Sequence, residues 1–141
     1  MMITLALCFL GTLGFLISLY FALVYYSMIC ADQAFIPALC RLDESTCQRL
    51  IRRPEAHLFG FPNCVAGLIY YPAVVAAALL PPGSAPWYER AVLFAGGGAL
   101  SVGLYLSYLL LARLRTNCVL CFASHVVNAC LFLLLLVRTR T

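Results

Sequence analysis

The chain has 141 residues, of which 65% are hydrophobic and only 10% are charged. A soluble domain normally carries about 25% charged residues, so this composition excludes an ordinary water-exposed exterior and indicates a protein embedded in lipid. The net charge of +4 comes from arginines alone, and their scattered positions argue against nucleic-acid binding.

Four apolar segments are long enough to cross a hydrocarbon layer of about 30 Å, at about 1.5 Å of helical rise per residue. They run over about 3–29, 64–80, 87–111 and 118–137. The first segment has neither the basic start nor the cleavage site of a signal peptide, so we expect it to be retained as a span. The sequence therefore predicts an all-α integral membrane protein, with one four-helix bundle domain over 1–141.

The third apolar segment carries two further signals. Trp87 and Tyr88 at its start suit an anchor at the membrane interface. Small residues that let helices approach closely in lipid recur along it at four-residue spacing, in the pairs Gly97/Ser101 and Gly103/Ser107. We expect these small residues to serve packing within the bundle.

The connections between the segments differ in length. Residues 81–86 and 112–117 are tight turns, whereas 30–63 is a long loop with four arginines and four acidic residues. Counting crossings puts this loop and the start of the fourth helix on one side of the membrane, and both termini on the other. We expect the loop to cap that end of the bundle, where four cysteines share one membrane face: Cys40, Cys47, Cys118 and Cys121.

Cys118 and Cys121 open the fourth helix as a Cys-x-x-Cys motif. Residues three apart lie on one side of a helix, and the positive end of the helix dipole favours a thiolate in the first turn. Such a pair is suited to thiol–disulfide exchange, which requires only that a thiolate reach a disulfide sulfur. Cys40 and Cys47 in the loop can therefore deliver electrons to it, although a simple disulfide that staples the loop is an alternative reading of the loop pair.

Below the motif, Cys121, His125 and Asn128 form one stripe down the fourth helix. Polar side chains within a membrane bundle usually face its interior, so the stripe runs from a redox thiol into the bundle. A quinone suits this position, because it dissolves in the bilayer and accepts two electrons and two protons, as one dithiol supplies. Asn63, at the start of the second helix, can donate a hydrogen bond to a quinone carbonyl.

A second class of function stays open. Soft metal ions such as copper(I), mercury and zinc are also bound by cysteine pairs, so a membrane carrier of soft metals is the alternative. The loop spacing of Cys-x6-Cys is loose for a structural zinc site. We therefore expect redox chemistry and no bound metal.

The chain resembles the vitamin K epoxide reductase family along nearly its whole length. The most specific feature is the order of the cysteines, with the loop pair first and the Cys-x-x-Cys at the start of the last of four helices. DsbB-type oxidases carry the same parts in reverse order. Shorter matches support the resemblance: "LALC" and "SLY" in the first helix, "ALC" at 38–40, N-x-x-x-G at 63–67, and "CVLC" followed by Asn128.

The resemblance implies a role for each of the four cysteines. Cys40 and Cys47 would be the shuttle pair of the loop, with Cys40 facing an external partner and Cys47 exchanging with Cys118. Cys121 would lie next to the quinone. The partner would be a separate thioredoxin-fold, DsbA-like protein, since no such domain is fused to this chain.

The resemblance also implies residues that bind the quinone, whether ubiquinone, menaquinone or vitamin K. Asn63 matches the family's asparagine that hydrogen-bonds the quinone head group. His125 stands where the family commonly has a tyrosine, and histidine can both donate a hydrogen bond and carry a proton. Tyr71 is a third candidate for the pocket wall.

Other readings of several residues stay open. Asn63 can be a helix N-cap as well as a ligand, His125 can be a core histidine, and we expect Asn128 to make an interhelical hydrogen bond. We expect Cys8 and Cys130 to be packing residues. Cys30 and Cys64 can pair, but we expect free thiols.

The arginines bear on orientation. Six lie on the cysteine face, and three lie opposite, namely Arg90, Arg138 and Arg140. The positive-inside rule alone would place the cysteines in the cytoplasm. Since disulfide chemistry requires an oxidising side in most organisms, we expect a bacterial inner-membrane protein with a periplasmic cysteine face, an endoplasmic reticulum membrane being the other candidate.

Overall fold

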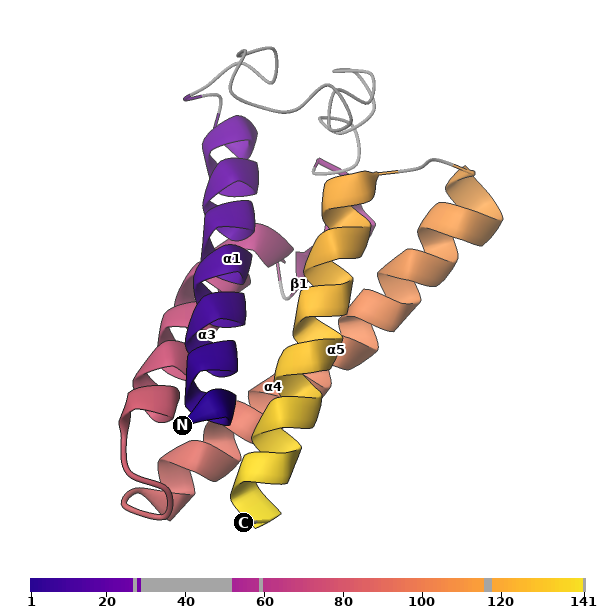
Figure 1. Ribbon diagram of the computed structural model, residues 1–141. Helices are drawn as coiled ribbons and strands as arrows, with labels where there is room; N and C mark the ends of the chain where they lie inside the picture. The colour runs from indigo at the N-terminus through magenta and orange to yellow at the C-terminus, as the bar shows by residue number, and fades with distance from the viewer. Residues whose placement is uncertain (27, 29–51, 59, 116–117, 141) are drawn as a thin grey trace.

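The computed structural model of the protein describes residues 1–26, 28, 52–58, 60–115 and 118–140 (Figure 1). Cys30, Cys40 and Cys47 lie outside the described residues. The predictions made for these three cysteines therefore stay predictions.

Four long helices make up most of the described chain (Figure 1). They are α1 (Met2–Tyr25), α3 (Asn63–Leu79), α4 (Pro86–Tyr108) and α5 (Val119–Arg140), and α4 continues into a π-helical turn, η3 (Leu109–Leu114). The two termini and the turn between α3 and α4 lie at one end of the bundle. The start of α5 and the start of α3 lie toward the other end.

The helices have the length and composition of membrane spans. Among the described residues, α1, α5 and the helical stretch Pro86–Arg113 are long and apolar enough to cross a membrane. Helix α3 is also apolar but has 17 residues, which corresponds to about 25 Å at about 1.5 Å per residue. The predicted all-α membrane bundle is confirmed.

The helices pack as two close pairs, α1 with α3 and α4 with α5, and α1 also packs against α5, whereas α3 and α4 contact each other much less. Glycine allows the close approach of the first pair, because a Cβ atom added at Gly14 would overlap the ring of Tyr71. The bundle core lies toward the end that carries the termini and contains the fully buried Leu7, Val74 and Leu131.

Two buried charged side chains stabilise, through hydrogen bonds, the end of the bundle that lies opposite the cysteines. Arg138 of α5 donates from Nη1 to the carbonyl of Ala78 (2.9 Å) and from Nη2 to that of Leu80 (2.5 Å). It thereby satisfies carbonyls that the end of α3 leaves without helical partners. Glu89 in the first turn of α4 accepts a hydrogen bond from the backbone of Gly83 (3.0 Å) and so fixes the preceding turn.

The segment before α3 borders the other end of the bundle. It consists of a 3-10 turn, η2 (Pro54–Ala56), and a short antiparallel pair, β1 (His57–Leu58) and β2 (Phe61–Pro62). His57 donates from Nδ1 to the carbonyl of Arg53 (2.7 Å), because a carbonyl can only accept, and its Nε2 contacts the hydroxyl of Tyr25 (3.3 Å). The contact with Tyr25 ties the segment to the end of α1.

Candidate functional site

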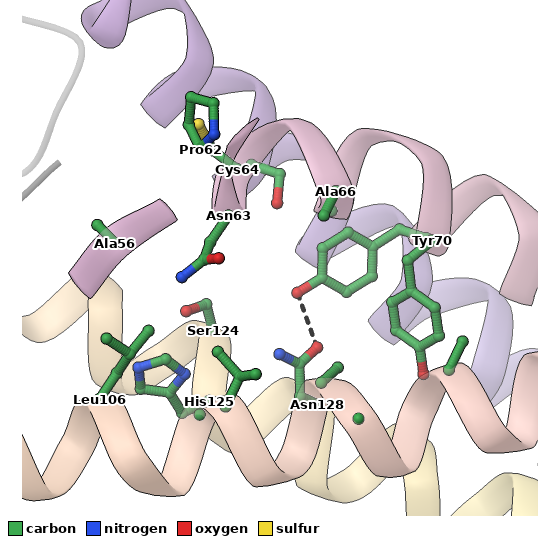
Figure 2. Close-up of a pocket in the computed structure, with 18 of the residues that line it drawn as sticks. Ala56, Pro62, Asn63, Cys64, Ala66, Tyr70, Leu106, Ser124, His125 and Asn128 are labelled. Carbon is green, nitrogen blue, oxygen red and sulfur yellow. Dashed lines mark hydrogen bonds between the residues drawn. The ribbon is translucent and has the colours of Figure 1, made fainter. Parts of the chain in front are cut away.

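A cavity of about 1040 Å³ lies where α3 and α4 diverge. Its walls are mostly apolar and come chiefly from α3, α4 and α5, with Arg53 and Ala56 of the preceding segment at one end. The residues that the sequence analysis expected to react with or bind a quinone and that line this cavity are Asn63, Tyr71, Cys121 and His125. Figure 2 shows the polar ends of Asn63, Ser124 and His125 around one hollow.

The Cys-x-x-Cys motif begins α5. Cys118 precedes the first helical residue, its side chain is 1% exposed, and its carbonyl accepts the hydrogen bond of Phe122 N (3.1 Å) that starts the helix. Cys121 lies in the first turn, is partly exposed, carries a free thiol and lines the cavity. The first N–H groups of a helix have no partners within it, and the effect that the sequence analysis expected of them on the Cys121 sulfur stays a prediction.

Asn63 does not cap its helix. The N-cap residue of α3 is Pro62, and no side chain makes a capping hydrogen bond there, so the N-cap interpretation of Asn63 is wrong. Its amide nitrogen Nδ2 is buried and has no hydrogen-bond partner among the described residues. A buried donor left unsatisfied costs about 1–3 kcal/mol. The amide is therefore directed to something other than its own helix, and Figure 2 shows it facing the hollow.

His125 lies one helical turn below Cys121 on the same face of α5. Its Nδ1 is buried and makes no hydrogen bond within the described part of the chain. His125 is therefore not a core histidine whose hydrogen bonds the described residues satisfy. The ring fits against α4 because residue 103 is a glycine, since a Cβ atom there would lie 2.9 Å from Nδ1 and 3.3 Å from Cγ. Gly103 thus makes room for the His125 ring as well as for helix packing.

Tyr71 is only 3% exposed, and its hydroxyl is committed to the protein. It donates a hydrogen bond of 2.9 Å to Oδ1 of Asn128 in α5, shown as the dashed line in Figure 2. The predicted interhelical hydrogen bond of Asn128 is confirmed. Tyr71 contributes a wall of the cavity, whereas its hydroxyl hydrogen is not available to a ligand.

Several polar residues at the cavity were not singled out from the sequence as site residues, and three of them lie near its cysteine end. Arg53 and Arg113 line the cavity at its cysteine end, and Ser124 lines it beside Cys121. Ser124 was detectable in principle, because it lies three residues after Cys121 and shares its helix face. Its hydroxyl donates to the carbonyl of Cys121 (2.7 Å), which leaves the oxygen able to accept a further bond.

The remaining described cysteines do not form a second centre. Cys64 carries a free thiol, as predicted, while Cys8 packs against the bundle core. Among the residues that the structure describes, no group of three or more His, Cys, Asp or Glu side chains is placed to hold a metal ion.

The donor set fits a quinone. Small-molecule pockets are mostly apolar, with a few placed polar groups that orient the ligand. Here the cavity brings together a thiol, an amide donor and an imidazole, and the last two have buried nitrogen atoms without protein partners. A flat, apolar ring with carbonyl oxygens at its edge would satisfy these groups and fill the space between the helices.

The sequence profile of the vitamin K epoxide reductase family matches residues 5–136 of the chain. A search of curated proteins gave no match. The match covers nearly the whole chain, so the protein belongs to the vitamin K epoxide reductase family, and the resemblance found in its cysteine order is confirmed. It is accordingly a membrane protein with redox activity, an oxidoreductase of a family that uses quinones.

Proposed function

We propose that the protein is a membrane thiol:quinone oxidoreductase that supports disulfide bond formation. A reduced partner gives up two electrons and two protons as its dithiol becomes a disulfide. The electrons pass through Cys40 and Cys47 to Cys118 and Cys121, and a quinone leaves as the quinol with both electrons and both protons. Each transfer between cysteine pairs is a thiol–disulfide exchange, so sulfur–sulfur bonds are conserved until the quinone is reduced.

One observation carries the proposal. Cys121 opens onto an apolar cavity in which two further groups, the Asn63 amide and the His125 imidazole, have buried nitrogen atoms that no described residue satisfies. A carbonyl oxygen of a quinone would take the amide hydrogen bond, and His125 would hold a proton at the same end. Both groups withdraw electron density from the ring, which favours attack by an anionic sulfur at Cys121.

The wider setting follows from the same chemistry. The donor would be a separate thioredoxin-fold, DsbA-like protein that exchanges with Cys40. Its product disulfides belong to an oxidising compartment, which favours a bacterial inner membrane with the cysteine end in the periplasm. Ubiquinone, menaquinone and vitamin K or its epoxide share the carbonyl-bearing ring that the donors require.

The test is quinone reduction by the purified protein, followed by the absorbance of the quinone. A reduced thioredoxin-fold protein is one electron donor, and a small membrane-permeable dithiol is the other. We expect Cys40→Ala to lose turnover with the protein donor but to keep it with the small dithiol. Cys121→Ala loses both reactions, while Cys130→Ala, with a free thiol on the same helix outside the cavity, keeps both.

Two outcomes would contradict the proposal. Equal turnover in wild type and Cys121→Ala would show that the cavity thiol takes no part. A wild type that reduces no quinone but binds a soft metal ion stoichiometrically through its cysteines would favour the alternative, a metal carrier.

A further inference from the structure

Asn128 occupies the deep end of the polar stripe on α5. It lies on the cavity wall, and its side-chain oxygen accepts the hydrogen bond from Tyr71. No described residue accepts a hydrogen bond from its amide nitrogen, which is not buried within protein and points toward the hollow in Figure 2. The residue therefore has one end held by the protein and one end free for a ligand.

The orientation of this amide is set by a hydrogen bond between α3 and α5. The hydroxyl of Tyr71 on α3 donates to Oδ1 of Asn128 on α5. Because Oδ1 accepts the phenol hydrogen, the nitrogen at the opposite end of the amide is left for the cavity.

The rigidity of Tyr71 makes this arrangement specific. Its ring packs closely against two glycines. A Cβ atom at Gly14 of α1 would overlap the ring, and one at Gly67 of α3 would lie 3.2 Å from its Cε2 atom. A ring confined in this way cannot swing to follow a rotated amide. The position of its hydroxyl therefore selects one of the two amide orientations of Asn128.

We propose that Asn128 is a third hydrogen-bond donor to the substrate, that it contacts the quinone carbonyl on the side of the ring away from Cys121, and that Tyr71 is the positioning residue that directs its amide. This inference rests on the proposed quinone reduction. Along α5, His125 lies about 6 Å and Asn128 about 10 Å below Cys121, at about 1.5 Å per residue. Asn63 and His125 serve the nearer carbonyl, and Asn128 reaches the farther one on the opposite side of the ring.

The test measures binding apart from turnover. In a Cys121→Ala background, the dissociation constant of 2-methyl-1,4-naphthoquinone is measured by quenching of intrinsic fluorescence. It is determined for Asn128→Ala, for Tyr71→Phe, for the combination of both, and for Tyr105→Phe, the same exchange at an exposed site on α4. Thermal unfolding of every variant is recorded by circular dichroism, and turnover is measured with Cys121 restored.

We expect Asn128→Ala to raise the dissociation constant about five- to tenfold, the effect of losing one hydrogen bond. Tyr71→Phe keeps the ring and raises the dissociation constant about threefold, because the Asn128 amide is no longer held in one orientation. The combination matches Asn128→Ala within about twofold, since Tyr71 acts only through Asn128. Tyr105→Phe binds like its parent.

Several results would overturn the inference. If Asn128→Ala lowers the unfolding temperature but leaves the dissociation constant unchanged, the residue has a structural role only. If the effects of the two substitutions multiply in the combined variant, Tyr71 does not act through Asn128. If wild type reduces no quinone and the parent binds none, the proposed function itself fails, and the inference fails with it.

Discussion

Replacing Gly103 by alanine tests whether His125 is held at the cavity by contact with α4. The added Cβ atom would lie 2.9 Å from Nδ1 and 3.3 Å from Cγ of the ring. Carbon contacts are optimal at about 3.5–4.0 Å, so the imidazole must shift by about half an ångström or more. Overpacking of this kind typically costs about 1–3 kcal/mol, whereas alanine in a helix gains about 0.5–1 kcal/mol over glycine.

Gly97→Ala separates these two effects. A Cβ atom at Gly97 would have its nearest neighbour at 3.5 Å, on the ring of Phe132, which is an ordinary contact. We expect Gly97→Ala to unfold at or above the wild-type temperature in detergent. Gly103→Ala should lie about 1–3 kcal/mol below Gly97→Ala in free energy of unfolding. It should also raise the KM for quinone, because the displaced ring enters the substrate space, while Gly97→Ala leaves KM unchanged.

The combination of Gly103→Ala with His125→Ala decides whether the ring is the cause. Without the imidazole the new methyl group meets no obstacle, so Gly103→Ala should become neutral or stabilising in the His125→Ala background. If Gly103→Ala is as destabilising there as in wild type, the strain lies in the backbone of α4 or in another neighbour. The assigned role of Gly103 in positioning His125 would then be wrong.

Two other substitutions probe the framework around the site. Arg138→Ala removes two charge-assisted hydrogen bonds from the end of α3, so we expect a loss of about 2–3 kcal/mol in the free energy of unfolding. The control is Arg140→Ala, at an exposed position two residues on, which should change the free energy of unfolding by less than about 0.5 kcal/mol. Gly14→Ala drives a methyl group into the ring of Tyr71 and should lower the unfolding temperature, while Gly98→Ala, where an added Cβ meets no atom within 4 Å, should not. A neutral Gly14→Ala would show that α1 and α3 can separate at no cost.

The fold and part of the site were predictable, because lipid imposes simple rules. A span must be apolar and long, and residues four and seven apart share a helix face wherever the helix is placed. The stripe of Cys121, His125 and Asn128 follows from this spacing alone. The direction of the Asn63 side chain does not follow from spacing, since an asparagine at a helix start can turn to its own backbone or into a cavity. That choice depends on how close α5 lies.

The features that could not be predicted from the sequence depend on contacts between residues far apart in the chain. From the sequence, Arg138 counts only as a charge on one membrane face, but its carbonyl partners lie 58 and 60 residues away and bury it. The hydroxyl of Tyr71 is bound to a residue 57 positions later, which separates its role in the cavity wall from a role in ligand contact. No local pattern encodes such pairs, since each depends on the packing of helices that are far apart in sequence.

The polar groups of the cavity divide into those that the protein satisfies and those that it leaves open. The Tyr71 hydroxyl donates its hydrogen to Asn128, and the Ser124 hydroxyl donates to a backbone carbonyl, so neither can donate to a ligand. The Asn63 amide, the Tyr70 hydroxyl and the His125 ring remain without partners among the described residues, and an unsatisfied buried group costs about 1–3 kcal/mol. A ligand that satisfies them recovers this free energy and stabilises the bundle as it binds. The cost of these unsatisfied groups and the affinity proposed for a carbonyl-bearing substrate thus have one physical origin.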